Sequence, residues 1–430
     1  MRRPRSAVFG LVALTLLTSV LTGCGTGGGI TLRVIQSLTS PERTALLRDM
    51  ITAFEAANPE IDVRLISPPL QSADQKIAQV LSAKNDVDLV EVRDYTVKQF
   101  VNNQSLLDLS PYVANWPGWP ELTPLARQKA ASVGGKPYLV PYGFFQNTLF
   151  ARTDRLSEAG LKPPATWPEL IEAAVKLTEP GKNRFGYSFR GGAGTFHYAV
   201  SIISAYAGPQ VDPAQGFWRK DGSTIFASPE AVTAMEAFLR LFKTGSPPGS
   251  LAWSYPEMVQ GFTSGVTSLL IQDPEVIKTT ERATGLPKGS WTTLPIPKGP
   301  TGLALQPTGY AGWGVTSFSR NRDAAVKLLE FLSSAEQGLR WAKEHSLIPV
   351  HTAAAQDPQF STGAFKAYLD MANDPAQVVV ERPIQYPGWG RWQKQADIDV
   401  QSLLVGEKTV AEVLGSWDKF WAEQKKAGGA

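Results

Sequence analysis

The sequence predicts an α/β protein whose body folds as two lobes built on parallel-type sheets. Two observations support this prediction. Segments with strand and helix character alternate from Ile30 to Val92, which is typical of helices that connect parallel strands. The chain has 430 residues, more than one hydrophobic core usually serves, so a division into two lobes is expected.

The amino-terminal segment has the features of an export signal. Three arginines within the first five residues precede an apolar run from Ala7 to Leu21, which is too short for a typical membrane span. The motif Leu-Thr-Gly-Cys that ends at Cys24 resembles the bacterial lipobox, in which the signal is cut before a cysteine that carries lipid. The alternative is a buried apolar segment with an unrelated cysteine. We expect residues 1–23 to be a lipoprotein signal peptide and 24–29 a lipidated, glycine-rich tether.

The composition of the body excludes several functional classes. Without its first 23 residues the chain has 42 − 3 = 39 basic residues against 39 acidic ones, so nucleic-acid binding has no electrostatic support. Cys24 is the only cysteine, and once lipidated it leaves no thiol for a disulfide. His197, His345 and His351 show no spacing of metal ligands. We therefore expect no metal and no cofactor.

The first half of the body can be divided into elements in order. The β-branched residues of 30–35 predict a strand. Ser40 and Pro41 suit a helix start, and apolar residues then recur at helical spacing until Asn58. The following elements are expected to be a strand at 61–66, a helix at 71–83 and a strand at 87–92.

Polar residues follow two of these strands. Ligands of open parallel sheets gather at the carboxyl ends of the strands, and these ends are Gln36 and Ser37 for one strand and Asp94 and Tyr95 for the other. Asp94 could equally cap the helix that follows it. One carboxylate could also serve both purposes.

Four motifs in the middle of the chain occur in an order that carries a specific resemblance. They are Gly-Lys-Pro-Tyr at 135–138, Val-Pro-Tyr at 140–142, Asn-Thr-Leu-Phe-Ala-Arg at 147–152, and Gly-Leu-Lys-Pro-Pro-Ala-Thr-Trp-Pro-Glu-Leu at 160–170, with Thr166 and Glu169 spaced as a capping box. This order resembles the family 1 extracellular solute-binding proteins, the sugar-binding components of ABC importers.

The resemblance continues toward the carboxyl terminus. A strand with small residues at 262–271 precedes a loop, a glycine-rich strand follows at 309–315, and a turn with a second capping box lies at 406–412. The family often has glycine or an aromatic residue after the first of these strands, where this chain has Gln272 and Asp273. The ligand group bound there is therefore expected to differ.

The resemblance implies a periplasmic-binding-protein-like fold with a cleft between two lobes that close about a hinge. Proline-bearing extended runs at 140–142, 294–297 and 347–350 are the candidate crossings, although each could be an ordinary loop. Lobe 1 is then expected to hold residues 30–140 and 298–348. Lobe 2 is expected to hold 141–297 and 349–430.

A sugar offers apolar C–H faces and a ring of hydroxyls, so aromatic and polar side chains are the candidates for binding it. Trp313 and Trp389 lie beside glycines, where stacking on a ligand and buried hinge packing are both possible. Arg190 opens a glycine loop that lacks the ending of a phosphate-binding loop; it could bridge sugar hydroxyls or pair on the surface. The candidate ligand-binding residues are Gln36, Ser37, Asp94, Tyr95, Tyr142, Arg190, Gly191, Trp253, Gln272, Asp273, Tyr310, Trp313, Tyr386, Trp389 and Arg391.

The resemblance implies a monomeric, membrane-anchored lipoprotein that captures a sugar or oligosaccharide outside the cytoplasm and delivers it to the permease of an ABC importer. Two other classes stay open: a secreted glycoside hydrolase with two carboxylates, and a sugar-sensing lipoprotein without a transport role. The sequence contains none of the common hydrolase motifs. The ligand could also be a polyol or a glycerol phosphoester.

Overall fold

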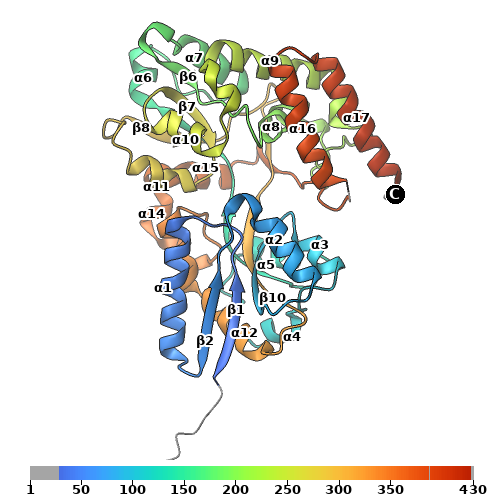
Figure 1. Ribbon diagram of the computed structural model, residues 1–430. Coiled ribbons are helices and arrows are strands. Elements are labelled where there is room, and N and C mark those ends of the chain that lie inside the picture. Colours follow the sequence, from blue (N-terminus) through green and yellow to red (C-terminus); the bar gives the residue numbers. More distant parts are fainter. Residues whose placement is uncertain (1–28, 387, 428–430) are drawn as a thin grey trace, which may run out of the picture.

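The computed structural model describes residues 29–386 and 388–427. Figure 1 shows two lobes, one above the other, connected by several chain segments. Lobe 1 contains the amino-terminal strands and helices, and lobe 2 contains the middle of the chain and the carboxyl-terminal helices. The expected two-lobe α/β architecture is confirmed. The proposed signal peptide and Cys24 lie outside the described residues, as does the tether except for Gly29.

A five-stranded sheet forms the centre of lobe 1, with strand order β2-β1-β3-β10-β4. Its strands are β1 (Ile30–Ile35), β2 (Ile61–Ile66), β3 (Leu89–Arg93), β4 (Val140–Phe145) and β10 (Gly309–Val315). Strand β1 runs parallel to β2 and β3, whereas β10 is antiparallel to both β3 and β4.

Seven helices cover the sheet of lobe 1. They are α1 (Pro41–Ala57), α2 (Leu70–Ser82), α3 (Val97–Asn102), α4 (Ser110–Val113), α5 (Pro124–Ala130), α12 (Arg322–Leu332) and α13 (Ala335–His345). Helix α1 begins as expected, because the Ser40 side chain accepts a hydrogen bond from the Arg43 amide. Leu47, Met50 and Phe54 recur at helical spacing and are buried in the lobe 1 core.

The sheet of lobe 2 has four strands in the order β6-β7-β5-β8. These are β5 (Thr148–Arg152), β6 (Phe185–Tyr187), β7 (Thr267–Gln272) and β8 (Trp291–Leu294); β9 (Ala304–Gln306) and β11 (Gln377–Val379) form a separate parallel pair. Strand β6 is parallel to β7, but β5 is antiparallel to β7 and β8. Both main sheets are therefore mixed, not simply parallel, because β5 and β10 each enter from the other lobe and no crossover helix sets their direction.

The helices of lobe 2 lie around this sheet in the upper part of Figure 1. They are α6 (Thr153–Glu158), α7 (Trp167–Lys176), α8 (Phe196–Ala207), α9 (Pro229–Gly245), α10 (Tyr255–Thr263), α11 (Glu275–Glu281), α14 (Pro358–Ser361), α15 (Lys366–Asn373), α16 (Trp389–Leu404) and α17 (Val410–Ala427). Both expected capping boxes are present, at Thr166 with Glu169 and at Thr409 with Glu412. Phe262 belongs to α10, so the following strand is shorter than expected.

A cluster of aromatic side chains joins α16 and α17 to the rest of lobe 2. The Trp392 ring lies 5.2 Å from Phe217, 5.3 Å from Phe196 and 5.4 Å from Trp417, measured between ring centroids. These edge-on contacts bury large apolar area and restrict the orientation of each ring. The cluster thereby fixes α16 against the start of α8, which faces the other lobe.

The chain crosses between the lobes at positions that differ from those expected. Strand β4 stays in the lobe 1 sheet through Phe145, so the first crossing is 146–147 and not 140–142. The second is 307–308, since Lys298 pairs with Thr166 and β9 pairs with β11 before β10 begins. The segment 347–350 lies along lobe 1, where the amide of the nearby Thr352 bonds the Glu121 carbonyl. The chain leaves that lobe only after Asp357, which pairs with Lys343 of α13. The apolar, proline-bearing runs therefore lie within one lobe or the other, and the crossings themselves lie elsewhere in the chain.

Candidate ligand-binding cleft

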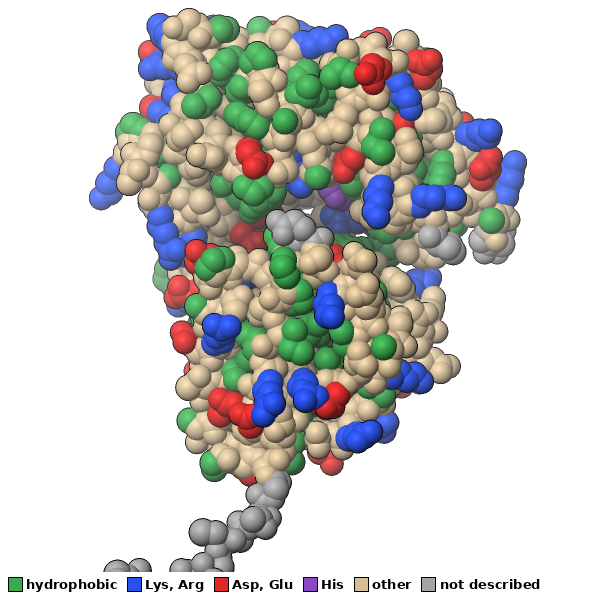
Figure 2. All heavy atoms as spheres, viewed as in Figure 1, with side chains coloured by type: hydrophobic (Ala, Val, Ile, Leu, Met, Phe, Trp, Pro, Cys, Tyr) green, Lys and Arg blue, Asp and Glu red, His purple; other side chains and the backbone are tan. Residues whose placement is uncertain are grey.

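A cleft of about 1290 Å³ lies between the two lobes, and Figure 2 shows the hollow from one side. Lobe 1 contributes the start of α1 and the loop after β3. Lobe 2 contributes α8, the loop between β7 and α11, and the segment after β11. These are strand ends and helix starts, which is where ligands of α/β folds gather.

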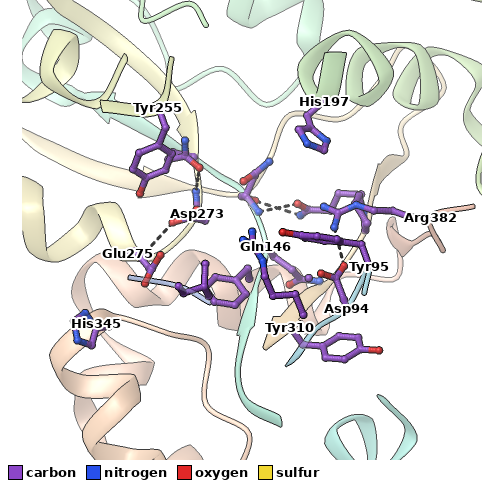
Figure 3. A pocket seen from close by; sticks show the side chains of 18 of the residues that line it. Asp94, Tyr95, Gln146, His197, Tyr255, Asp273, Glu275, Tyr310, His345 and Arg382 are labelled. Atoms are coloured by element: carbon purple, nitrogen blue, oxygen red, sulfur yellow. Dashed lines mark hydrogen bonds and ion pairs between the residues drawn. The ribbon is translucent and has the colours of Figure 1, made fainter. Parts of the chain in front are cut away.

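Figure 3 shows that polar side chains gather at two ends of the cleft. The Asp94 end comprises Asp94, Tyr95, His197 and Arg382; the Arg43 end comprises Arg43, Tyr255, Asp273 and Glu275. Each end contains an arginine and a carboxylate that face each other from opposite lobes.

At the Asp94 end, the Asp94 carboxylate accepts a hydrogen bond from Arg382 Nη1 at 2.8 Å. Burial raises the pKa of Asp94 more than Arg382 and Arg93 lower it. Asp94 does not cap the following helix, because Thr96 precedes that helix and the Asp94 amide bonds the Tyr310 carbonyl. Its carboxylate is therefore directed into the cleft toward lobe 2 (Figure 3).

Tyr95 and Arg93 form an ordered wall beside Asp94. The Tyr95 hydroxyl donates to Asp74 at 2.6 Å, and the Arg93 guanidinium lies over the Tyr95 ring at 4.6 Å from its centroid. A cation over an aromatic face is attracted by the ring quadrupole. These contacts hold the tyrosine ring in one orientation at the edge of the cleft.

His197 lies in the first turn of α8 and faces the cleft (Figure 3). Its side chain is accessible from the cleft, yet the surrounding protein and the positive charges of Arg382, Arg190 and Arg93 hold its pKa well below the usual value. At neutral pH the imidazole is therefore uncharged.

The glycine loop before α8 does not offer its backbone to a ligand. The amides of Gly194 and Phe196 donate to the two carboxylate oxygens of Asp397 at 2.7 and 3.1 Å. Asp397 comes from α16, so the aromatic cluster that holds α16 also holds this loop. Arg190 lines the cleft from the start of the loop, with its Nε bonded to the Ala193 carbonyl at 2.6 Å.

At the Arg43 end, a buried network links the lobes. The Arg43 side chain is only 5% exposed and pairs with Glu275 of lobe 2. It also donates to the Tyr142 hydroxyl at 2.5 Å and to the Leu38 carbonyl at 3.1 Å. Tyr142 in turn donates to Glu91, whose other oxygen accepts from the Ser37 and Leu38 amides.

Asp273 lies beside this network on the lobe 2 side. Burial and the nearby Glu275 carboxylate raise the pKa of Asp273 to about 8. The preceding Gln272 accepts a hydrogen bond from the Asp273 amide and donates to the Tyr198 hydroxyl. The carboxyl group of Asp273 is thus largely protonated at neutral pH and can donate as well as accept hydrogen bonds.

Seven of the fifteen candidate residues line the cleft: Asp94, Tyr95, Arg190, Gln272, Asp273, Tyr310 and Trp389. They come from both lobes, so strand ends that are far apart in the sequence do meet at one place. Trp389 is 6% exposed and shares its ring between the cleft edge and the aromatic cluster.

The other candidates in lobe 1 serve the core. Gln36 is buried and bonds the Leu38 carbonyl and two hydroxyls, and Ser37 is buried beside Glu91. Tyr142 and Trp313 have no exposed area, and their rings pack against each other at 5.7 Å. Trp313 is buried because β10 is a central strand with both faces covered, so its flanking glycines open no path to the cleft.

The remaining candidates in lobe 2 also lie outside the cleft lining. The Gly191 amide bonds the Ser250 carbonyl, and the Trp253 ring packs over Gly261. The Tyr386 ring packs on Trp218 at 5.1 Å. Arg391 is exposed and lies over the Phe420 ring. Neighbouring glycine or proline does not tell which way a side chain points, so the sequence could not place these four residues relative to the cleft.

Residues that the sequence did not select as ligands complete the cleft. The main ones are Gln146, Asn147, His197, Tyr198, Tyr255, Gln306 and Arg382. Gln146 and Asn147 lie in the first crossing, and the start of α8 just after the glycine loop could have indicated His197. Among residues 29–386 and 388–427, no cluster of histidine, cysteine and acidic side chains could hold a metal ion. None of the helices in that part of the chain is long and apolar enough to cross a membrane.

Comparison with known proteins gives one consistent result. The chain matches the bacterial extracellular solute-binding protein model over residues 39–339. It is 25% identical to a putative binding protein of Brucella abortus, covering 84% of this chain and 85% of that one, and 24% identical to an uncharacterized lipoprotein of Streptomyces antibioticus, covering 94% and 90%. The solved structure of maltose-bound T. maritima MalE3 has the same fold, with a TM-score of 0.79 at 21% identity over 91% of this chain and 98% of that one. Since the family model spans well over half of the sequence, the chain belongs to the bacterial extracellular solute-binding proteins.

Proposed function

We propose that the protein is the carbohydrate-binding subunit of an ABC importer, which encloses a sugar between its lobes and presents it to a permease. The observation that carries this proposal is an interlobe cleft walled by aromatic rings and by charged hydrogen-bonding groups. The half-buried rings of Tyr95 and Tyr255 offer apolar surface to a sugar ring, while Asp94 and Arg382 offer an acceptor and donors for hydroxyls.

The carboxylates of the cleft support binding more than catalysis. A glycoside hydrolase needs one carboxylic acid and one free carboxylate on either side of the scissile bond. Asp273 has the raised pKa of an acid, but its neighbour Glu275 is paired with Arg43 and Asp94 is paired with Arg382. Both of these carboxylates are therefore held by an arginine of the facing lobe, which suits a binding site.

The known relatives point in the same direction. T. maritima MalE3, which shares the fold, was solved with maltose bound, and the family name describes binding of solutes outside the cell. A sugar-binding role with hinge closure agrees with both. The monomeric state that we propose suits a protein whose binding surface is shared between two lobes of one chain.

We further propose that Cys24 carries the lipid that holds the protein at the outer face of the cell membrane. The lipobox-like motif supports this, and the relative from Streptomyces antibioticus is named a lipoprotein. Cys24→Ala should release the protein into the soluble fraction or leave it unprocessed. Unchanged retention in the membrane fraction and unchanged mobility on gels would contradict lipidation.

The central experiment combines calorimetric titration with small-angle scattering. A panel of mono-, di- and oligosaccharides, polyols and glycerophosphodiesters is titrated into the purified protein. A member that binds should return unchanged and should reduce the radius of gyration of a monomer. Release of hydrolysis products would favour the enzyme, and tight binding without compaction would argue against hinge closure.

A further inference from the structure

The Asp94 end of the cleft has more hydrogen-bond donors than the protein itself uses. Arg93, Arg190 and Arg382 all line this part of the cleft, and each guanidinium has five N–H groups. Among the described residues, Arg382 donates to Asp94, Arg190 donates to the Ala193 carbonyl, and Arg93 lies 3.5 Å from Asp74. Most of the fifteen N–H groups are left for water or a ligand.

Each acceptor at the same end already has at least one partner in the protein. Asp94 accepts from Arg382, and Asp74 accepts from the Tyr95 hydroxyl. Asp397 accepts from two backbone amides. A hydroxyl group donates one hydrogen bond and accepts others, whereas a carboxylate or phosphate only accepts. The surplus of donors is therefore better matched by an anionic group than by hydroxyls alone.

His197 lies among these arginines and reports the local potential. Apart from burial, the influences on its pKa come from Arg382, Arg190 and Arg93, and all three lower it. The three guanidinium groups therefore add a positive contribution to the potential at the ring. An anion beside the ring would offset that potential and would allow the imidazole to become a second kind of cationic donor.

We propose that the ligand is an anionic carbohydrate, a sugar or polyol with a carboxylate or phosphate group, and that this group binds among Arg190, His197 and Arg382. This inference rests on the proposed carbohydrate function and specifies the chemical class of the ligand. The aromatic rings of Tyr95 and Tyr255 then contact the neutral part of the same molecule.

This arrangement makes binding dependent on pH. When the anion binds, the pKa of His197 rises and a proton is taken up, so affinity increases as pH falls through the new pKa. The charged groups near His197 are Arg93, Arg190 and Arg382. Asp74, Asp94 and Asp397 lie near these arginines, and Glu381 also lines the cleft. Of these, Asp94 and Asp397 have raised pKa values. Protonation of Asp397 at low pH removes negative charge and changes the affinity in the same direction, whereas protonation of Asp94 removes a charged acceptor for the hydroxyls of the ligand and opposes it.

The test uses matched pairs of ligands in calorimetric titrations of the purified protein. The pairs are glucose with glucuronate, galactose with galacturonate, and glycerol with glycerol 3-phosphate and its choline diester. We expect the acidic member of at least one pair to bind tenfold or more tighter than its neutral partner. Its affinity should fall as salt is added and as pH rises from 5.5 to 8. The uronate and phosphate arms distinguish the two kinds of anion.

A neutral sugar that binds as tightly as its acidic partner overturns this inference but leaves the carbohydrate function intact. If no member of this panel or of the wider panel of neutral sugars binds, the carbohydrate function fails and the inference fails with it.

Two variants separate the electrostatic role from a general effect on the cleft. His197→Gln should weaken the acidic ligand at pH 5.5 by about tenfold, since about 1.4 kcal/mol corresponds to a decade, and should remove most of the pH dependence. Arg190→Lys keeps the charge but loses the planar fork, so it should weaken binding at every pH. Arg391→Gln, an exposed arginine outside the cleft lining, should leave the affinity unchanged. Equal losses for acidic and neutral ligands in His197→Gln would overturn the inference.

Discussion

The two ends of the cleft use the same pair of chemical groups for different purposes. Arg43 with Glu275 and Arg382 with Asp94 are both arginine–carboxylate pairs that join lobe 1 to lobe 2. Arg43 is 5% exposed and has three further partners in lobe 1. The side chains of Arg382 and Asp94 are 26% and 14% exposed, and within residues 29–386 and 388–427 the Arg382 side chain donates to Asp94 alone. Both ends use the same residue types. An arginine that has several other partners in the protein forms a structural pair, whereas an arginine with few partners keeps N–H groups that can bind a ligand.

The largest effect is expected from breaking the buried pair. Arg43→Met leaves Glu91 and Tyr142 buried without the cation that faces them, and such a loss typically costs about 3–5 kcal/mol of the free energy of unfolding. Urea denaturation followed by tryptophan fluorescence measures the change. Arg48→Met, at an exposed site of the same helix, is the control and should cost less than about 0.5 kcal/mol. Equal stability of the two variants would remove the structural half of the comparison.

A second large effect is expected at Trp313, which packs against Tyr142 below the Arg43 end. Trp313→Phe removes buried ring volume and should lower the free energy of unfolding by roughly 1–3 kcal/mol. Because the ring has no exposed area, the affinity for any ligand should stay within about twofold of wild type. Trp119→Phe, at the partly buried edge of the same core, should be milder. If Trp313→Phe loses affinity without losing stability, Trp313 contacts the ligand and its assignment to the core is wrong.

Asp94→Asn tests the other end of the cleft. The ligand loses a charged acceptor and Arg382 loses the partner that orients it, so affinity should fall by about tenfold or more. Stability should change by at most about 1 kcal/mol, because the pair is partly exposed. Asp49→Asn, on the exposed side of α1 at the cleft rim, is the matched control in the same titration. If Asp94→Asn melts normally and binds as wild type, the assignment of this end as the ligand site is wrong.

The last effect concerns Asp273 and depends on pH. Its folded-state pKa of about 8 exceeds the ordinary value of 3.8, so the folded protein holds a proton that the unfolded chain releases. The stability due to this proton is complete below about pH 4 and decreases as pH rises toward 8. Asp273→Asn should therefore match wild type at pH 4 and exceed it at pH 8 by roughly 1 kcal/mol or more.

Thermal unfolding of Asp273→Asn at both pH values gives this difference directly. Asp370→Asn, which alters an exposed carboxylate paired with Lys366, provides the comparison and should show no such crossing. If the stability of wild type and Asp273→Asn changes in the same way with pH, the Asp273 carboxyl is ionised in the folded protein. The Arg43 end of the cleft would then hold one more negative charge.

The sequence was most informative where local chemistry decides the structure. Ser40 with Pro41 and Thr166 with Glu169 start helices through contacts within three residues, so these signals could be read directly. Asp94 and Tyr95 were found because a ligand-side loop must follow a buried strand in this kind of sheet.

Long-range packing explains what the sequence could not provide. Trp313 lies between glycines, but only the pairing of β10 with β3 and β4 shows that both faces of that strand are covered. Arg382 meets Asp94 from 288 residues away, and no local pattern marks it as a cleft residue. The mixed direction of the strands also depends on crossings that no periodicity reveals.

The hydrogen bonds between the first two crossings limit how the lobes can move. Gln146 donates to Thr308 at 2.7 Å, and the Gln306 side chain accepts from the Asn147 amide and donates to its carbonyl. Because these two connecting segments are bonded side by side, we expect them to bend together more easily than they slide past each other. With the third connection after Asp357, we expect the easiest motion of the lobes to be a rotation about an axis that runs through the first two crossings. The two lobes should rotate apart about this axis, so the Asp94–Arg382 and Arg43–Glu275 pairs should both break in the same motion.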